Sequence, residues 1–241
     1  MQHSGCSGIV IMINTPPMEK KPQIDRSTIS FLHDLSRHND RLWFTGNRPR
    51  YDKARENFSH FVQAVIDDII EYDSIMRGLE AKSCIFRINR DIRFTRDKSV
   101  YKTNFGAFIV RGGKKNGDRF PGYYLHIEPG QSFVSGGAYI PPSPWLNRIR
   151  ENISVNGNRL VQIIDSKEYR KYFDGLEGEK LKVPPRGYSK YHPHIELIKM
   201  KSYLPEKLFT DEEVVSAGFF RVVTGAFRAM KPLNDFLSEG I

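Results

Sequence analysis

Apolar residues at three- and four-residue spacing predict two helices near the start of the chain. The first is expected to begin at Ser27 or Thr28, either of which can cap a helix. The second is expected to run from Pro49, a residue suited to the first helical position, to near Asp73. Their apolar faces are Ile29, Leu32 and Leu35 in the first, and Tyr51, Ala54, Phe58, Phe61, Val62, Val65, Ile69 and Ile70 in the second.

The period then changes to two, which is typical of strands. Alternation over residues 84–89 predicts one strand, although the arginine spacing argues against regular strand beyond Ile88. Three further strands are expected at 105–110, 123–128 and 131–140. Their connections are short, with glycine-rich or Pro-Gly turns at 112–117 and 129–130. These segments therefore predict an antiparallel meander.

Helical patterns return in the second half of the chain. Ser143 and Pro144 open a predicted helix that is expected to stop at Asn156 and Gly157. Short helical pieces follow at 160–164 and 169–173, and the prolines at 184–185 predict irregular backbone. The segment 210–213 fits a capping box before a helix over about 214–230.

Strands grouped between helices predict the fold class α+β, with an antiparallel or mixed sheet flanked by helices. A single domain is expected over residues 25–241, preceded by a flexible extension over residues 1–24 that is rich in glycine, serine and proline. The chain has 241 residues, 39% of them hydrophobic, which is enough for a substantial core and argues against wholesale disorder.

Composition also bears on where the protein works. No apolar run reaches the length of about 18–20 residues that a membrane-spanning helix needs, so no membrane partner is expected. The two cysteines, Cys6 and Cys84, form neither a disulfide framework nor a CxxC pair. This predicts a reducing, cytoplasmic compartment.

Positive charge is concentrated in one part of the chain. Lys and Arg number 37 against 28 Asp and Glu, a net charge of +9. Residues 84–119 hold ten basic and three acidic residues, a net charge of +7, so the rest of the chain carries only +2. Such clustering favours an anionic partner, although a solvated basic face remains the simpler alternative.

The densest part of this cluster is the segment 87–104, where arginines recur every third residue from 87 to 96. Guanidinium groups suit phosphate and carboxylate, and the interleaved aromatic side chains suit stacking on bases or packing in a core. The alternative is an internal network in which Asp91 and Asp97 hold the arginines. The residues predicted to bind a ligand are Arg87, Asn89, Arg90, Arg93, Lys98, Tyr101 and Lys102.

The sequence signals for an enzyme are weaker than those for binding an anion. Tyr124, His126 and Glu128 share one face of a predicted strand and, with Asp91, are the candidates for proton transfer. The alternative for the trio is the solvent face of a sheet or a satisfied hydrogen-bonded set. No motif with metal-ligand spacing, P-loop or nucleophile elbow is present in the sequence, so neither a metal nor a cofactor is expected.

Several motifs spread over most of the chain, from about Phe31 to about Met230, occur together. They are Phe31-Leu32, Trp43-Phe44, Asn47-Arg48, residues 86–94, residues 97–98, residues 101–104, residues 123–130, Gly136-Gly137, residues 176–179, residues 184–188 and His192-Pro193. With these motifs the chain resembles domain-of-unknown-function family 2461, found mostly in bacteria and also in some fungi. Val100 departs from that family's usual proline and Ser135 from a common glycine. The resemblance implies a compact soluble domain and brings no activity, cofactor or catalytic residue.

Three functions remain open from the sequence. The leading one is a basic loop that binds a phosphate-bearing small molecule, a nucleotide or a nucleic acid. The second is an enzyme acting on a small anionic metabolite, which predicts a cavity where the loop meets the strand face. The third is a structural or interaction module with an internal Arg–Asp network, in which Glu177 or Glu179 are further expected partners of the arginines.

Overall fold

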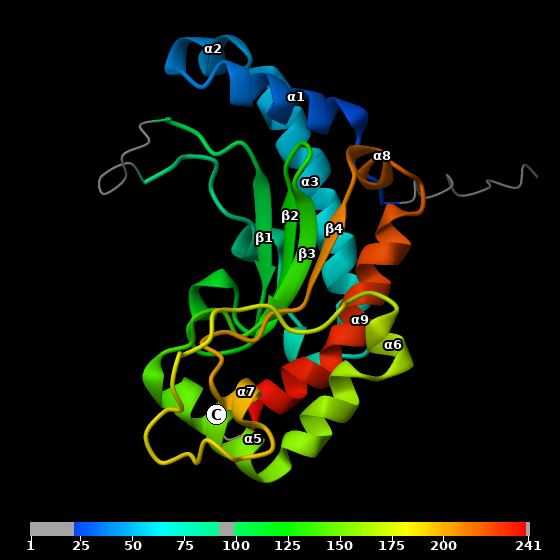
Figure 1. Ribbon diagram of the computed structural model, residues 1–241. Coiled ribbons are helices and arrows are strands. Elements are labelled where there is room, and N and C mark those ends of the chain that lie inside the picture. Colours follow the sequence, from blue (N-terminus) through cyan, green and yellow to red (C-terminus); the bar gives the residue numbers. More distant parts are fainter. Residues whose placement is uncertain (1–21, 92–98, 240–241) are drawn as a thin grey trace, which may run out of the picture.

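Four antiparallel strands form the centre of the computed structural model, which describes residues 22–91 and 99–239 (Figure 1). The strands are β1 (Phe105–Ile109), β2 (Gly122–Ile127), β3 (Ser132–Gly137) and β4 (Glu206–Phe209), in that spatial order. Chain order and spatial order coincide, so β1 to β3 form the predicted meander. The α+β class predicted from the sequence is confirmed.

Helices precede and follow the first three strands along the chain. In the N-terminal half these are α1 (Arg26–Arg37), α2 (Arg41–Gly46), α3 (Arg48–Ile70) and α4 (Ala81–Cys84), with short 3-10 turns at Ser74–Met76 and Lys114–Asn116. The C-terminal half adds α5 (Ser143–Ile164), α6 (Lys167–Arg170), α7 (Ile195–Ile198), α8 (Asp211–Val214) and α9 (Phe219–Ser238). Figure 1 shows α3 and α9 side by side behind the strands.

The core lies between the sheet and the pair α3 and α9. The apolar face predicted for α3 is buried except at its two ends, where Tyr51 and Ile70 are partly buried. Phe61 stacks on Phe219 of α9 with ring centroids 5.5 Å apart. From the sheet, Tyr123, Leu125 and Ile127 are fully buried on the same side. Alternate residues of β2 therefore point away from these helices, toward the face that α3 and α9 leave open.

One predicted helix break is present and one predicted helix differs. Asn156 has non-helical φ −115° and ψ 21°, so the helix is interrupted where a stop was predicted, and the helical piece expected over 160–164 continues α5 beyond this kink. The following residue, Gly157, lies against His194, and a Cβ at this position would come within 2.2 Å of its ring. Close packing therefore requires the glycine at this kink. The predicted C-terminal helix is divided into α8, which has the expected capping box at Thr210, and α9.

Strands were also mispredicted at two places. Residues 81–84 form the helical turn α4, and the extended backbone begins at Ile85, which makes a single bridge to Ala107. Strand β4 was missed because its four residues include Glu206 and Lys207 and follow Pro205. It pairs with β3, and the paired residues Ser132 and Phe209 are 77 positions apart, so the pairing leaves no local signal.

The packed domain begins before residue 25. Residues 1–21 of the predicted extension lie outside the described residues, but Ile24 is fully buried. The Gln23 side chain donates to the Val215 carbonyl at 2.6 Å, and Asn57 Nδ2 donates to the Gln23 carbonyl at 2.8 Å. Within the described ranges, no helix combines the length and the apolar composition needed to cross a membrane.

Candidate functional site

In the basic segment, residues 85–91 and residues 99–104 form two arms next to β1 that are paired by backbone hydrogen bonds (Figure 1). The Phe86 N–H donates to the Gly106 carbonyl at 2.9 Å, the Lys102 N–H to Ile88 at 2.8 Å, and the Arg90 N–H to Val100 at 3.0 Å. The pairing reaches Arg90 through isolated bridges and forms no regular strand, as predicted for the chain beyond Ile88. Residues 92–98, which connect the two arms in sequence, lie outside the described residues, and with them the predicted ligand residues Arg93 and Lys98.

Asn39 fixes the second arm to the helical part of the domain. Its side chain donates to the Tyr101 carbonyl and accepts from the Tyr101 N–H, both at 2.9 Å. The Tyr101 ring stacks on Phe44 with centroids 4.0 Å apart and is only 8% exposed. Tyr101 was predicted to place a ligand, but burial against Phe44 makes its side chain an anchor of the arm instead.

The other predicted residues of the arms are more accessible. Arg87, Asn89 and Asp91 are exposed, and Arg90 is partly buried. Glu179, an expected partner of the arginines, instead pairs with Lys201 at 2.8 Å. Exposure leaves Arg87 and Asn89 accessible to a ligand.

Lys102 differs from these residues in its surroundings. Its ammonium group lies 5.2 Å from the centre of the Phe86 ring, and the side chain is partly buried. Burial, with a smaller contribution from the like charges of Arg87 and Arg90, lowers the pKa of Lys102 from its ordinary value. No carboxylate within the described ranges lies at ion-pair distance from it.

A cavity of about 500 Å³ opens on the sheet face that α3 and α9 leave uncovered. It lies where the arms meet the strands, as the enzyme hypothesis predicted, because Lys102 and Tyr124 both line it. Five of its eleven lining residues are aromatic, Lys102 contributes a cation from the arm side, and Glu206 contributes a carboxylate from β4. The lining includes Phe86, Phe108, Tyr124, Phe133, Lys102, Ser135 and Glu206.

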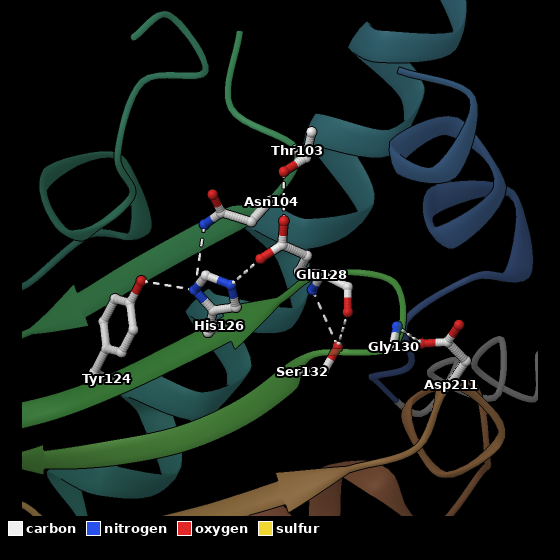
Figure 2. A network of polar contacts seen from close by, with 8 residues as sticks. All are labelled: Thr103, Asn104, Tyr124, His126, Glu128, Gly130, Ser132 and Asp211. Carbon is white, nitrogen blue, oxygen red and sulfur yellow. Dashed lines mark hydrogen bonds and ion pairs between the residues drawn. The ribbon is translucent and has the colours of Figure 1, made fainter. Parts of the chain in front are cut away.

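Tyr124, His126 and Glu128 form one continuous hydrogen-bonded chain along β2 (Figure 2). Tyr124 Oη lies 2.9 Å from His126 Nδ1, and His126 Nε2 lies 2.9 Å from Glu128 Oε2. The other Glu128 oxygen accepts from the Thr103 hydroxyl, and Asn104 Nδ2 lies 3.3 Å from His126 Nδ1. Of these residues, Tyr124 lines the cavity.

The turn after β2 holds Glu128 in place. The buried Ser132 hydroxyl accepts from the Glu128 N–H at 3.0 Å and donates to the Glu128 carbonyl at 2.9 Å. The Gly130 N–H donates to Asp211 of α8 at 2.8 Å. The His126 ring stacks on Phe133 with centroids 4.6 Å apart. These contacts hold the backbone at Glu128 and the imidazole ring of His126 in place.

A glycine gives the Tyr124 hydroxyl its position. Gly106 of β1 faces this residue, and a Cβ there would lie 2.9 Å from Tyr124 Oη. Burial, with a further contribution from Glu128, raises the pKa of Tyr124 to about 12. The phenol is therefore protonated at neutral pH.

Sequence reasoning missed several residues of this site. Asn104, Thr103 and Phe133 lie on the sheet face of the trio, but only the register Gly106↔His126↔Phe133 places them beside it. Asp91, the fourth proton-transfer candidate, lies on the arm rather than with the trio on β2. In the part of the chain that the structure describes, no group of three or more His, Cys, Asp or Glu residues is arranged to hold a metal ion.

A second, larger hollow of about 840 Å³ lies between residues 22–25 and α3. It begins at Pro22, the first described residue, and it contains none of the predicted site residues. The cavity on the open sheet face is therefore the better candidate.

The molecule is thus an α+β domain with an aromatic, lysine-containing cavity on the open face of its sheet. The chain belongs to the family described as "Conserved hypothetical protein (DUF2461)", which it matches over residues 27–236. No curated protein and no solved structure matches it.

Proposed function

We propose that the protein binds a small anionic ligand, such as a nucleotide or another phosphate-bearing molecule, in the cavity beside Lys102. The observation that carries this proposal is the position of the Lys102 ammonium group. It is partly buried in an aromatic cavity, and its pKa is lowered there by burial and by Arg87 and Arg90. A bound anion would offset the cost of holding this charge, because a charge-assisted hydrogen bond is stronger than a neutral one.

The walls of the cavity favour a ligand with a flat apolar body. Phe108, Tyr124 and Phe133 come from three neighbouring strands and line the cavity together with Phe86. Aromatic side chains stack on planar groups such as nucleobases. The cavity volume of about 500 Å³ lies within the range of small-molecule sites. The anionic end is expected near Lys102, with Arg87 and Asn89 accessible on the neighbouring arm.

The carboxylate of Glu206 restricts the ligand further. It enters the cavity from β4, whereas Lys102 precedes β1 at the opposite edge of the sheet. A neutral N–H or amino group on the ligand would satisfy Glu206, whereas a second anionic group there would be repelled. We also propose a reducing, cytoplasmic location, because Cys84 is a buried free thiol.

The test is calorimetric titration with nucleoside monophosphates and with inorganic phosphate at low salt. Lys102→Met is expected to weaken binding by about tenfold or more, which corresponds to the loss of one charge-assisted hydrogen bond. Lys115→Met is the matched control, because Lys115 belongs to the same basic segment, is exposed and does not line the cavity.

Two outcomes would reject the proposal. One is that no phosphate compound binds the wild-type protein, and the other is that Lys102→Met binds as tightly as Lys115→Met. A single-stranded oligonucleotide in the same series addresses the nucleic-acid alternative. Binding of the oligonucleotide alone, with a steep loss of affinity as salt rises, would replace the small ligand with nucleic acid.

A further inference from the structure

The donor of each hydrogen bond in the chain Tyr124–His126–Glu128 can be assigned. An ionised carboxylate only accepts hydrogen bonds, so Glu128 Oε2 accepts from an N–H at His126 Nε2. In the neutral imidazole the other nitrogen, Nδ1, then carries no proton and accepts. Tyr124 Oη and Asn104 Nδ2 are the two donors facing it. The phenol proton of Tyr124 therefore lies on a hydrogen bond to a base whose opposite side is held by a carboxylate.

The hydrogen-bonded trio Tyr124, His126 and Glu128 is not required to stabilise the β2–β3 turn. The β2–β3 turn is already held by Ser132 and by Asp211, so the trio is not needed to close it. The strand face that carries the trio is open, and Tyr124 lines the cavity with Lys102. A base, a carboxylate behind it and a hydroxyl at the cavity wall are the parts of an activated acid–base group.

We propose that Tyr124 transfers protons to and from the ligand, with His126 and Glu128 as positioning residues. The Tyr124 oxygen takes a proton from the ligand while the phenol proton passes to His126 Nδ1. The imidazolium that forms is paired with Glu128, and the electron pair left on the ligand is stabilised by the Lys102 ammonium. Return of the proton to a different ligand atom completes an isomerisation, with no other reactant required.

This inference rests on the proposed function for the anionic class of the ligand, but it is tested without an anion. The probe is an uncharged aryl sulfonyl fluoride, which forms an S–O bond to a phenol as the S–F bond breaks. Fluoride leaves, and the phenol proton goes to His126. Peptide mass spectrometry measures labelling of Tyr124 against Tyr191, an internal control that is 82% exposed. Tyr124 is expected to react about 10²-fold faster, the lower part of the range for a positioned base.

Two variants separate proton transfer from hydrogen bonding. His126→Gln keeps an oxygen that can accept from Tyr124 but cannot take up its proton, so labelling should fall to the rate of Tyr191. Glu128→Gln still accepts from His126 but removes the charge that stabilises imidazolium, and about a tenfold loss is expected. Unchanged unfolding midpoints would show that both variants remain folded.

The inference is overturned if Tyr124 labels no faster than Tyr191 in the wild-type protein, or if His126→Gln labels as fast as wild type. Lys115→Met should label Tyr124 at the wild-type rate, because Lys115 is exposed and does not line the cavity. The probe carries no anion, so fast labelling in a protein that binds no phosphate compound would reject the ligand class and retain the proton transfer.

Discussion

The two faces of the sheet use the same strands for different purposes. On β2, Tyr123, Leu125 and Ile127 are fully buried under α3 and α9, whereas Tyr124 and His126 between them face the open side. The buried face carries apolar packing, with one hydrogen bond from the Tyr123 hydroxyl to Asp73 at 2.9 Å. The open face combines aromatic walls, a lysine and a chain of proton donors and acceptors.

This contrast shows how one short sheet can both stabilise a fold and present chemistry. Alternation assigns neighbouring residues to opposite faces, so a change at one position need not disturb the next. Substitutions on the buried face should therefore act on stability, and those on the open face should act mainly on binding and reactivity.

The largest expected change in the free energy of unfolding follows from a substitution on the buried face. Leu125→Ala should lower the free energy of unfolding by about 3 kcal/mol, because it leaves a void under α3 and α9. Its neighbour Tyr124→Phe should cost about 1 kcal/mol, the value of one hydrogen bond. Equilibrium urea unfolding measures both. Equal losses at the two positions would show that the faces do not differ as described.

A smaller effect is expected where β1 touches the open face. Gly106→Ala would place a methyl group 2.9 Å from Tyr124 Oη, moving the hydroxyl away from His126. Labelling of Tyr124 by the sulfonyl fluoride should fall about tenfold, and the free energy of unfolding should fall by about 1 kcal/mol. Gly46→Ala is the control, because a Cβ there meets nothing within 4 Å, and it should change stability by less than about 0.5 kcal/mol.

The smallest expected effect has the opposite sign. Lys102→Met should raise the free energy of unfolding at neutral pH by about 0.5 kcal/mol, a modest value because the side chain is only partly buried and is screened by solvent. Burial and the neighbouring Arg87 and Arg90 lower the pKa of Lys102, so folding disfavours the charged form that is present at pH 7 in both states.

The lowered pKa of Lys102 also predicts that the stability of the wild-type protein and that of Lys102→Met depend differently on pH. Between the lowered pKa and the ordinary value of 10.5, the unfolded chain binds more protons at Lys102 than the folded protein does. The wild-type protein should therefore gain stability relative to Lys102→Met as pH rises through this window. Parallel curves for the two proteins in urea unfolding at several pH values would contradict the assigned environment of Lys102.

Much of the fold was predictable because it depends on local periodicity. The apolar stripe of α3, the alternation of β2, and the capping box at Thr210 are all visible within a few residues. The trio on β2 was found in the same way, since residues two apart share a face. The signals that failed were also local, as at Cys84, where alternation predicted the start of a strand but the residue ends the helical turn α4.

The site itself was only partly predictable. The concentration of positive charge indicated the arms, but neighbouring residues of the arms contribute differently to the site. Tyr101 is held in the core by Asn39 and Phe44, while Lys102 beside it lines the cavity. Nothing in the spacing of these residues distinguishes them, because the partner that buries Tyr101 lies about 60 positions earlier in the chain.

Local sequence was sufficient for the α+β class, most of the helices and strands, the shared face of Tyr124, His126 and Glu128, and the concentration of positive charge near them. Tertiary structure alone decided which sheet face stays open, that Glu206 of β4 enters the same cavity as Lys102, and that Gly106 makes room for the Tyr124 hydroxyl. The physical reason is that periodicity acts between near neighbours, whereas a cavity is formed by side chains that only folding brings together.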